Sequence, residues 1–157
     1  MKVSQASLEA AGLAAFIGEQ LAHHQVPGKY LVLQLPESKV FTHLKATQAF
    51  AAHVARFDCA FALEQFGAGL DSFQLLTHLQ PNLLKLDRSF TQGLPSNAEN
   101  QARLTEIAAR ARDIGIRTIA EFVQDAASMS ILFAAGIDYV QGNFLAPAGP
   151  GMHYDFE

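Results

Sequence analysis

The chain has 157 residues, of which 50% are apolar and 17% are charged, and its formal net charge is −4. This composition is typical of one packed globular domain and excludes an intrinsically disordered chain. The negative charge gives no electrostatic reason to expect DNA as a partner. No apolar run approaches the ~20 residues that span a bilayer, so no membrane insertion is expected. Cys59 is the only cysteine, which rules out an internal disulfide and is consistent with a reducing, cytoplasmic location.

Helix and strand patterns alternate along the chain. Short buried runs bounded by polar residues or glycine predict strands, and apolar residues spaced three or four apart predict helices. The expected strands cover residues 30–35, 59–63, 83–87, 116–120 and 137–140, with residues 1–4 as a short strand remnant. The expected helices cover residues 8–21, 41–54, 71–79, 96–115 and 125–135. The tail from Asn143 is rich in glycine and proline and is expected to be irregular.

Two of these helices carry clear end signals. Ser96 and Glu99 have the spacing of a capping box at the start of the helix over residues 96–115, and Gly115 suits its C-terminal cap. Gly136 is a similar stop signal after the helix that begins at Asp125.

The repeated order of strand and helix predicts an α/β fold with a parallel sheet. With the remnant included, the patterns give roughly six strands. A complete (β/α)8 barrel has eight strands and typically runs to ~250 residues, whereas an open parallel sheet suits the present length. The patterns alone leave both folds open. In α/β barrels the residues that follow the strands meet at one face, where the chemistry takes place.

The central stretch resembles a known family. Residues 62–73 read ALEQFGAGLDSF and residues 85–90 read KLDRSF. These segments are similar to ALDDFGTGYSSL and the later lysine-isoleucine-aspartate, arginine-serine-phenylalanine motif of EAL domains, which hydrolyse or bind cyclic di-GMP. Within the family, the chain resembles the degenerate EAL domain of FimX-type regulators. The resemblance implies a TIM-type (β/α) barrel.

The resemblance covers about the last two-thirds of such a barrel. The glutamate-alanine-leucine strand that names the family has no counterpart in the sequence. Residues 1–157 are therefore expected to form a partial EAL-like domain. Its open sheet edges are expected to be covered by the missing N-terminal segment or by a partner chain, because exposed edges promote aggregation.

Four residues depart from the family at positions that the resemblance assigns to a two-metal phosphodiesterase site. Lys2 stands in place of a metal-binding asparagine, and Gln34 in place of a metal-binding glutamate. Glu64 and Gln65 replace a pair of aspartates. An ammonium repels a divalent cation, and Mg²⁺ requires oxygen ligands. Loss of hydrolysis is therefore expected, with no catalytic residue, metal or cofactor assigned. Glu37 is retained, and the resemblance implies that it braces the loop after the former aspartate pair.

Residues retained after other strands are expected to form a cyclic di-GMP site. Lys85 suits a phosphate, or a salt bridge with Asp87 or Glu121. Glu121 suits a guanine edge and Gln141 suits a base or a phosphate, and the alternative for either is the capping of a loop. Phe122 replaces a family glycine, and it either stacks on a purine or packs in the core. The predicted ligand-binding residues are Lys85, Glu121, Phe122, Gln141, Glu64 and Gln65.

The resemblance implies a catalytically inactive receptor of cyclic di-GMP in bacterial signalling. By analogy with FimX-type regulators, it would relay the signal to a PilZ-type protein that controls type IV pili and twitching motility. Two alternatives stay open at this point. One is a weak metal-dependent cyclic di-GMP phosphodiesterase, and the other is a protein-interaction module that binds no nucleotide.

Overall fold

The structure is a computed structural model that describes residues 1–10, 12–69, 71–147 and 149. In this part of the chain, five parallel strands form one sheet in chain order. The strands are β1 (Val32–Pro36), β2 (Ala60–Phe66), β3 (Leu83–Leu86), β4 (Arg117–Ala120) and β5 (Tyr139–Val140). The predicted α/β class with a parallel sheet is therefore confirmed, and the sheet is open.

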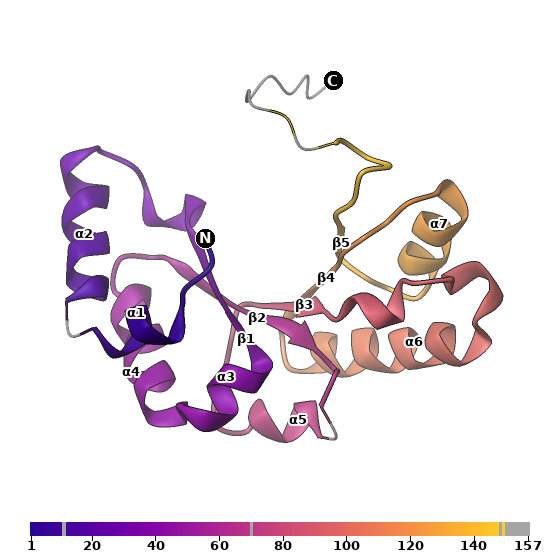
Figure 1. Ribbon diagram of the computed structural model, residues 1–157, viewed down its shortest axis with the longest axis horizontal. Helices are drawn as coiled ribbons and strands as arrows, with labels where there is room; N and C mark the ends of the chain where they lie inside the picture. Colours follow the sequence, from indigo (N-terminus) through magenta and orange to yellow (C-terminus); the bar gives the residue numbers. More distant parts are fainter. Residues whose placement is uncertain (11, 70, 148, 150–157) are drawn as a thin grey trace.

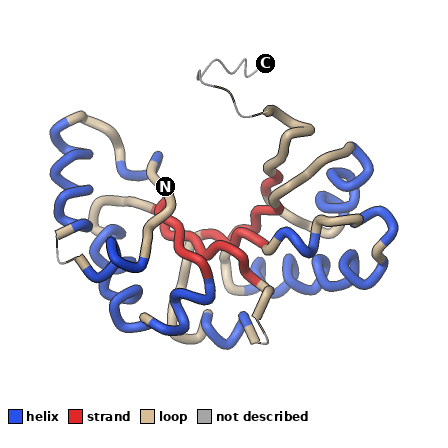
Figure 2. The backbone as a smooth tube through the Cα atoms, viewed as in Figure 1, coloured by secondary structure: helices blue, strands red, loops and turns tan. Residues whose placement is uncertain are grey.

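Helices connect the strands and lie along the outer side of the curved sheet (Figure 1, Figure 2). They are α1 (Gln5–Glu9), α2 (Leu13–His23), α3 (Glu37–Thr42), α4 (Leu44–Ala55), α5 (Ser72–Leu75), α6 (Ala98–Asp113) and α7 (Ala126–Ala134). Short 3₁₀ helices are η1 (Gly28–Tyr30), η2 (Arg88–Phe90) and η3 (Leu94–Ser96). None of the described helices combines the length and the apolar character needed to cross a membrane.

The outer face of the sheet forms the apolar core. Successive side chains of a strand face opposite sides, so every second residue points under the helices. The exposed fraction is 0% for Leu33, Leu35, Leu63, Leu84, Leu86 and Ala120. Helix residues such as Val54, Leu104 and Leu132 pack in the same cluster. This burial fixes the register of the strands, because a shift by one residue would turn the apolar set to the other face.

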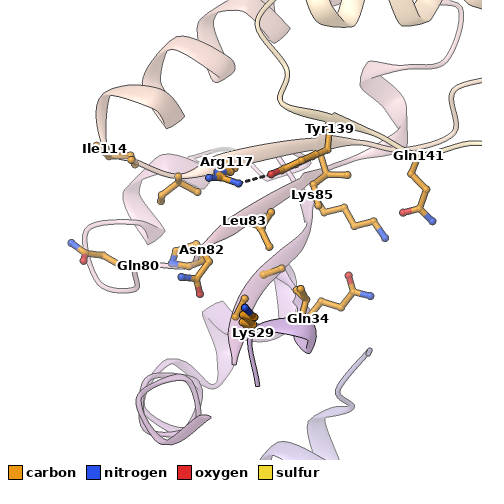
Figure 3. A pocket seen from close by; sticks show the side chains of 17 residues that line it. Lys29, Gln34, Gln80, Asn82, Leu83, Lys85, Ile114, Arg117, Tyr139 and Gln141 are labelled. Carbon is orange, nitrogen blue, oxygen red and sulfur yellow. Dashed lines mark hydrogen bonds between the residues drawn. The ribbon is translucent and has the colours of Figure 1, made fainter. Parts of the chain in front are cut away.

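The inner face of the sheet is more polar and lines an open hollow of about 880 Å³. Figure 3 looks into this hollow. The residues of the strands that line it are Val32, Gln34, Ala60, Ala62, Leu83, Lys85, Arg117, Ile119 and Tyr139. Most of them alternate along the strands with the residues of the outer core. The outer face thus stabilises the fold, and the inner face exposes the polar side chains that can bind a ligand.

The strand remnant expected at residues 1–4 is present, but it is shorter than predicted. Lys2 forms only an isolated parallel bridge with Gln34, along the free edge of β1. The N–H of Val3 donates to the carbonyl of Gln34 at 2.9 Å, and the N–H of Gln34 donates to the carbonyl of Met1 at 3.0 Å. Ser4 then caps α1, so the extended segment ends before a ladder can develop.

Two predicted helix boundaries are wrong. The pattern over residues 41–54 is divided at His43, which has φ −132° and ψ 39° and separates α3 from α4. The proposed capping box at Ser96 is not used, because Ser96 ends η3. Asn97 caps α6 instead, and its side chain accepts from the N–H of Asn100 at 3.0 Å. Asparagine and serine are equally good caps, so local preference alone does not choose between neighbours.

Other end signals are used as predicted. Asp125 caps α7 and accepts from the N–H of Ser128 at 2.7 Å. Gly115 and Gly136 follow their helices with φ of 73° and 89°, a left-handed conformation that favours glycine. The tail from Asn143 has no helix or strand where it is described, and the remainder of that prediction lies outside the described residues.

Truncation of Leu84, at the centre of the outer core, should destabilise the fold strongly. Leu84→Ala is expected to lower the free energy of unfolding by about 2–5 kcal/mol, because it leaves a cavity under the helices. Leu145→Ala is the matched control, since Leu145 is 47% exposed, and it should change stability by less than about 0.5 kcal/mol. Urea denaturation of both variants measures the difference, and equal losses would contradict this placement of the core.

Candidate functional site

The carboxyl ends of the parallel strands bring several predicted residues to one edge of the sheet. Glu64 lies near the end of β2 and Lys85 near the end of β3. Glu121 directly follows β4, and Gln141 directly follows β5. Figure 3 shows Gln34, Lys85 and Gln141 at the same end of the hollow. The sheet therefore gathers side chains that are far apart in the sequence.

Three of these side chains and that of Lys2 form an alternating row of charges, named here the strand-end charge cluster: Lys2, Glu64, Lys85 and Glu121. The Nζ of Lys85 lies 2.7 Å from Oε1 of Glu121 and 4.0 Å from Oε1 of Glu64. The Nζ of Lys2 lies 3.3 Å from the same oxygen of Glu64. Of the two ion pairs considered for Lys85, the one with Glu121 is present, whereas Asp87 caps η2.

Burial makes the compensation of these charges important. The Lys85 and Glu64 side chains are only 8% and 4% exposed, whereas Glu121 is 21% exposed and Lys2 is 74% exposed. Buried charges are stable in proteins when opposite charges or hydrogen bonds compensate for the lost hydration. The cluster therefore places the buried ammonium group of Lys85 and the exposed one of Lys2 at the edge of the hollow, with Glu64 between them.

A β-bulge separates the two residues that replace the family's aspartate pair. The β2–β3 register shifts between Leu63 and Phe66, so Glu64 and Gln65 together oppose Lys85. Gln65 has φ 55°, a left-handed conformation, and its side chain is exposed. It lines a different hollow, of about 480 Å³, together with Glu37 and other residues. The structure thus groups Glu64 with the charge cluster but not Gln65.

Glu37 braces the loop that follows β2, as the resemblance implied. Its side chain is buried at the start of α3, and Oε2 accepts from the N–H of Gly67 at 3.0 Å. Gly67 has φ 90°, and a Cβ there would meet the ring of Phe90 at 2.7 Å. Glycine is therefore required both for the conformation and for the space at this turn.

Phe122 is exposed, so the alternative that it packs in the core is wrong. Its side chain is 54% exposed, and its φ of 59° is left-handed, which fits the glycine that the family has at this position. It lines a hollow of about 390 Å³ with Arg88, Gln124 and Asp125, among others. The pKa of the Asp125 carboxyl lies below its usual range, because the backbone N–H of Ser128 and, to a smaller extent, the Ser128 hydroxyl donate hydrogen bonds to it.

The sequence analysis missed Arg88 as a residue of this region. It begins η2 directly after Asp87, and it lies in the same hollow as Phe122. Its signal was its place in the motif KLDRSF, immediately beyond the end of β3. The sequence analysis likewise missed the contact between Lys2 and Glu64, because local patterns do not show which side chains meet across a sheet.

The donor set does not fit the two-metal site that the family resemblance implies. A cation beside Glu64 would face the ammonium groups of Lys2 and Lys85, and like charges repel. Gln34 offers an uncharged amide, and Gln65 lies on the other side of the bulge. Among the described residues, no group of three or more His, Cys, Asp and Glu side chains could hold a metal ion. These residues are unsuited to Mg²⁺, which requires near-octahedral oxygen ligands.

The EAL domain model matches residues 1–148, and the chain belongs to the EAL domain family. The EAL domain of Xanthomonas citri FimX, solved in complex with c-diGMP, is 52% identical in sequence to this chain. The two structures superpose with a TM-score of 0.95, and the match covers 99% of this chain and 62% of that chain. The EAL domain of Pseudomonas aeruginosa FimX, bound to c-di-GMP, is 33% identical with a TM-score of 0.94, covering 99% and 64%. The predicted FimX-like resemblance and the barrel class, as an incomplete barrel, are confirmed.

Curated relatives include cyclic di-GMP phosphodiesterases. PdeF of Escherichia coli is 28% identical over 134 residues, which are 85% of this chain and 18% of that protein. PdeB of Shewanella oneidensis is 27% identical over 154 residues, which are 98% of this chain and 18% of that protein. The chain thus spans less than a fifth of the length of these two relatives. Similarity over so small a part does not assign the activity of either whole protein to this chain.

Removal of the Glu37 brace should loosen the loop after β2. Glu37→Ala leaves the partly buried N–H of Gly67 without its acceptor, which is expected to cost about 1–3 kcal/mol of stability. Glu37→Gln keeps an oxygen acceptor and should lose less. Hydrogen exchange of the amide of Gly67, read by mass spectrometry, measures the effect. Equal protection in the parent and in Glu37→Ala would contradict the role of the brace.

Proposed function

We propose that this chain is the nucleotide-binding part of a cyclic di-GMP receptor that does not hydrolyse its ligand. The observation that carries the proposal is the strand-end charge cluster. In it, the ammonium group of Lys2 lies 3.3 Å from Oε1 of Glu64, at a position where the family resemblance implies a metal-binding asparagine. The similarity to two FimX EAL domains solved with cyclic di-GMP supports the choice of ligand.

The retained residues supply complementary groups for each part of the nucleotide. Cyclic di-GMP carries two phosphodiesters and two guanine bases, so a receptor needs cationic groups and base-edge partners. Lys85 is the buried cation of the site and meets a phosphate. Glu121 holds Lys85 through Oε1, which leaves Oε2 to accept from a guanine N–H. Phe122 offers an exposed ring for stacking.

The remaining predicted residues have different parts in the proposal. Gln141 is exposed and provides an amide for base or phosphate. Glu64 keeps the two lysines in place and does not itself attract the anionic ligand. Gln65 faces the neighbouring hollow, so its contact with the nucleotide stays a prediction. The nucleotide is held by these side chains without a metal or a cofactor.

The receptor passes its signal to a protein partner. The similarity to FimX EAL domains supports a PilZ-type protein as partner and type IV pili with twitching motility as the output. Residues 1–157 act as a partial EAL-like domain. The exposed inner face and the free edge of β1 are covered by a further segment or by a partner chain, since open apolar surface and free strand edges favour association.

Weak phosphodiesterase activity is the second candidate function, because curated relatives carry that name. It needs divalent ions at the cluster, where the ammonium groups of Lys2 and Lys85 oppose them. A protein-interaction module without nucleotide binding is the third. It predicts that cyclic di-GMP produces no heat of binding in calorimetry.

Purified protein is expected to release no linear dinucleotide from cyclic di-GMP, even in excess Mg²⁺ or Mn²⁺. Gln65→Asp should restore nothing, since Lys2 and Gln34 still stand where ligands are needed. Chromatography of the nucleotide after incubation measures this, with an active EAL phosphodiesterase under the same conditions as the control. Product that increases with protein concentration would establish the weak phosphodiesterase instead.

Glu121→Ala and Phe122→Ala should each weaken cyclic di-GMP binding about tenfold or more. A charge-assisted hydrogen bond contributes roughly 1.5–3 kcal/mol and stacking of a base roughly 1–3 kcal/mol, and ~1.4 kcal/mol is a factor of ten in affinity. Calorimetric titration without divalent ions measures the change, and thermal melting checks folding.

Two variants serve as matched controls for this titration. Glu19→Ala removes an exposed carboxylate from α2, and Phe133→Ala removes a ring on α7 that is 50% exposed, close to the 54% of Phe122. Both should bind like the parent. If Glu121→Ala and Phe122→Ala also bind like the parent, the guanine bases lie elsewhere on the molecule.

A further inference from the structure

We infer that Lys2 is a positioning residue of this site: its ammonium neutralises the buried carboxylate of Glu64, so that Lys85 is paired with Glu121 alone when a ligand phosphate approaches. This inference rests on the proposed function. It adds a role for a residue that acts through Glu64 and does not have to touch the nucleotide.

The backbone places Lys2 for this contact. Its isolated bridge with Gln34 fixes it on the outer edge of β1, because Gln34 hydrogen-bonds to Met1 and Val3, the residues on either side of Lys2. Gln34 lines the inner hollow, and paired residues of neighbouring strands point to the same face. From this edge the Lys2 side chain reaches the end of the next strand, where its Nζ lies 3.3 Å from Oε1 of Glu64.

Glu64 depends on this ammonium because its surroundings offer little else. Its Oε1 is buried and accepts no hydrogen bond. The Nζ of Lys85 is the other cation, but it lies 4.0 Å from this oxygen and only 2.7 Å from Glu121. Lys85 is therefore engaged mainly by Glu121, and Lys2 is the closer cation for Glu64.

The charge balance of the cluster follows from these distances. With Lys2 present, two ammonium groups face two carboxylates, so the cluster is neutral. Without Lys2, Glu64 and Glu121 share the single ammonium of Lys85, and the cluster carries one net negative charge. A nucleotide with two anionic phosphodiesters would then approach a negative site, and Lys85 would be drawn between two carboxylates. Lys2 thus contributes a positive charge beside Glu64, at a position where the family resemblance implies a ligand of a metal ion.

The alternative is that Lys2 binds a phosphate directly, and a double variant separates the two roles. Lys2→Met should weaken cyclic di-GMP binding about 3- to 10-fold in calorimetry without divalent ions, the range expected for one lost charge near a partly screened site. Lys2→Met combined with Glu64→Gln restores the neutral cluster and should bind within about twofold of the parent. Lys2→Arg keeps the charge and should also bind like the parent.

A measurement without nucleotide keeps the inference separate from the proposed function. Lys2→Met should lower the melting temperature by about 2–4 °C, because Glu64 stays buried with less compensation, and the added Glu64→Gln should recover most of that loss. If the parent does not bind cyclic di-GMP, the proposed function fails, while the melting cycle still tests whether Lys2 acts through Glu64.

Lys45→Met is the control for a general effect of charge. Lys45 is exposed on α4 and takes part in none of the ion pairs of the cluster, so its removal changes the net charge of the protein equally and should alter neither binding nor melting. The inference is overturned if Lys2→Met binds and melts like the parent. It is also overturned if the double variant binds as weakly as Lys2→Met, which would assign Lys2 to the phosphate itself.

Discussion

Five parallel strands in chain order place their carboxyl ends along one edge of the sheet, and the burial of their outer face holds them there. The leucines at 0% exposure fix the register, and the register decides which residues share the edge. Glu64, Lys85 and Glu121 meet for this reason, although they lie on different strands. The apolar outer face and the charged inner edge are therefore two results of the same alternation along each strand.

The charge cluster explains how an EAL fold can serve as a receptor. Metal ions in a hydrolytic site bring positive charge and also an activated water. Lysine ammonium groups bring the charge alone, and they are held in position by carboxylates that are already part of the fold. Under the proposed function, Lys2 would supply positive charge beside Glu64 without bringing the activated water of a metal site.

Patterns that depend on neighbouring residues were predictable, and contacts across the sheet were not. The apolar runs located β2, β3 and β4 well, and Asp125 with Gly136 marked the ends of α7. The brace from Glu37 followed from family resemblance. The β-bulge was missed because it lies beyond residue 63, where the predicted strand ended, and only the buried Phe66 marks the break in alternation. The bulge directs Gln65 to a neighbouring hollow and leaves Glu64 in the charge cluster, although their adjacent positions in the sequence predicted one shared site.

The left-handed backbone at Phe122 has a consequence for the stability of the fold. A non-glycine residue in this region of φ and ψ costs about 1–3 kcal/mol, and the ring, at 54% exposure, recovers only part of it by burial. Glycine adopts this backbone conformation without steric cost and would leave the fold unchanged. Phenylalanine therefore lowers the stability of the fold relative to glycine at this position, while its ring stays available at the surface.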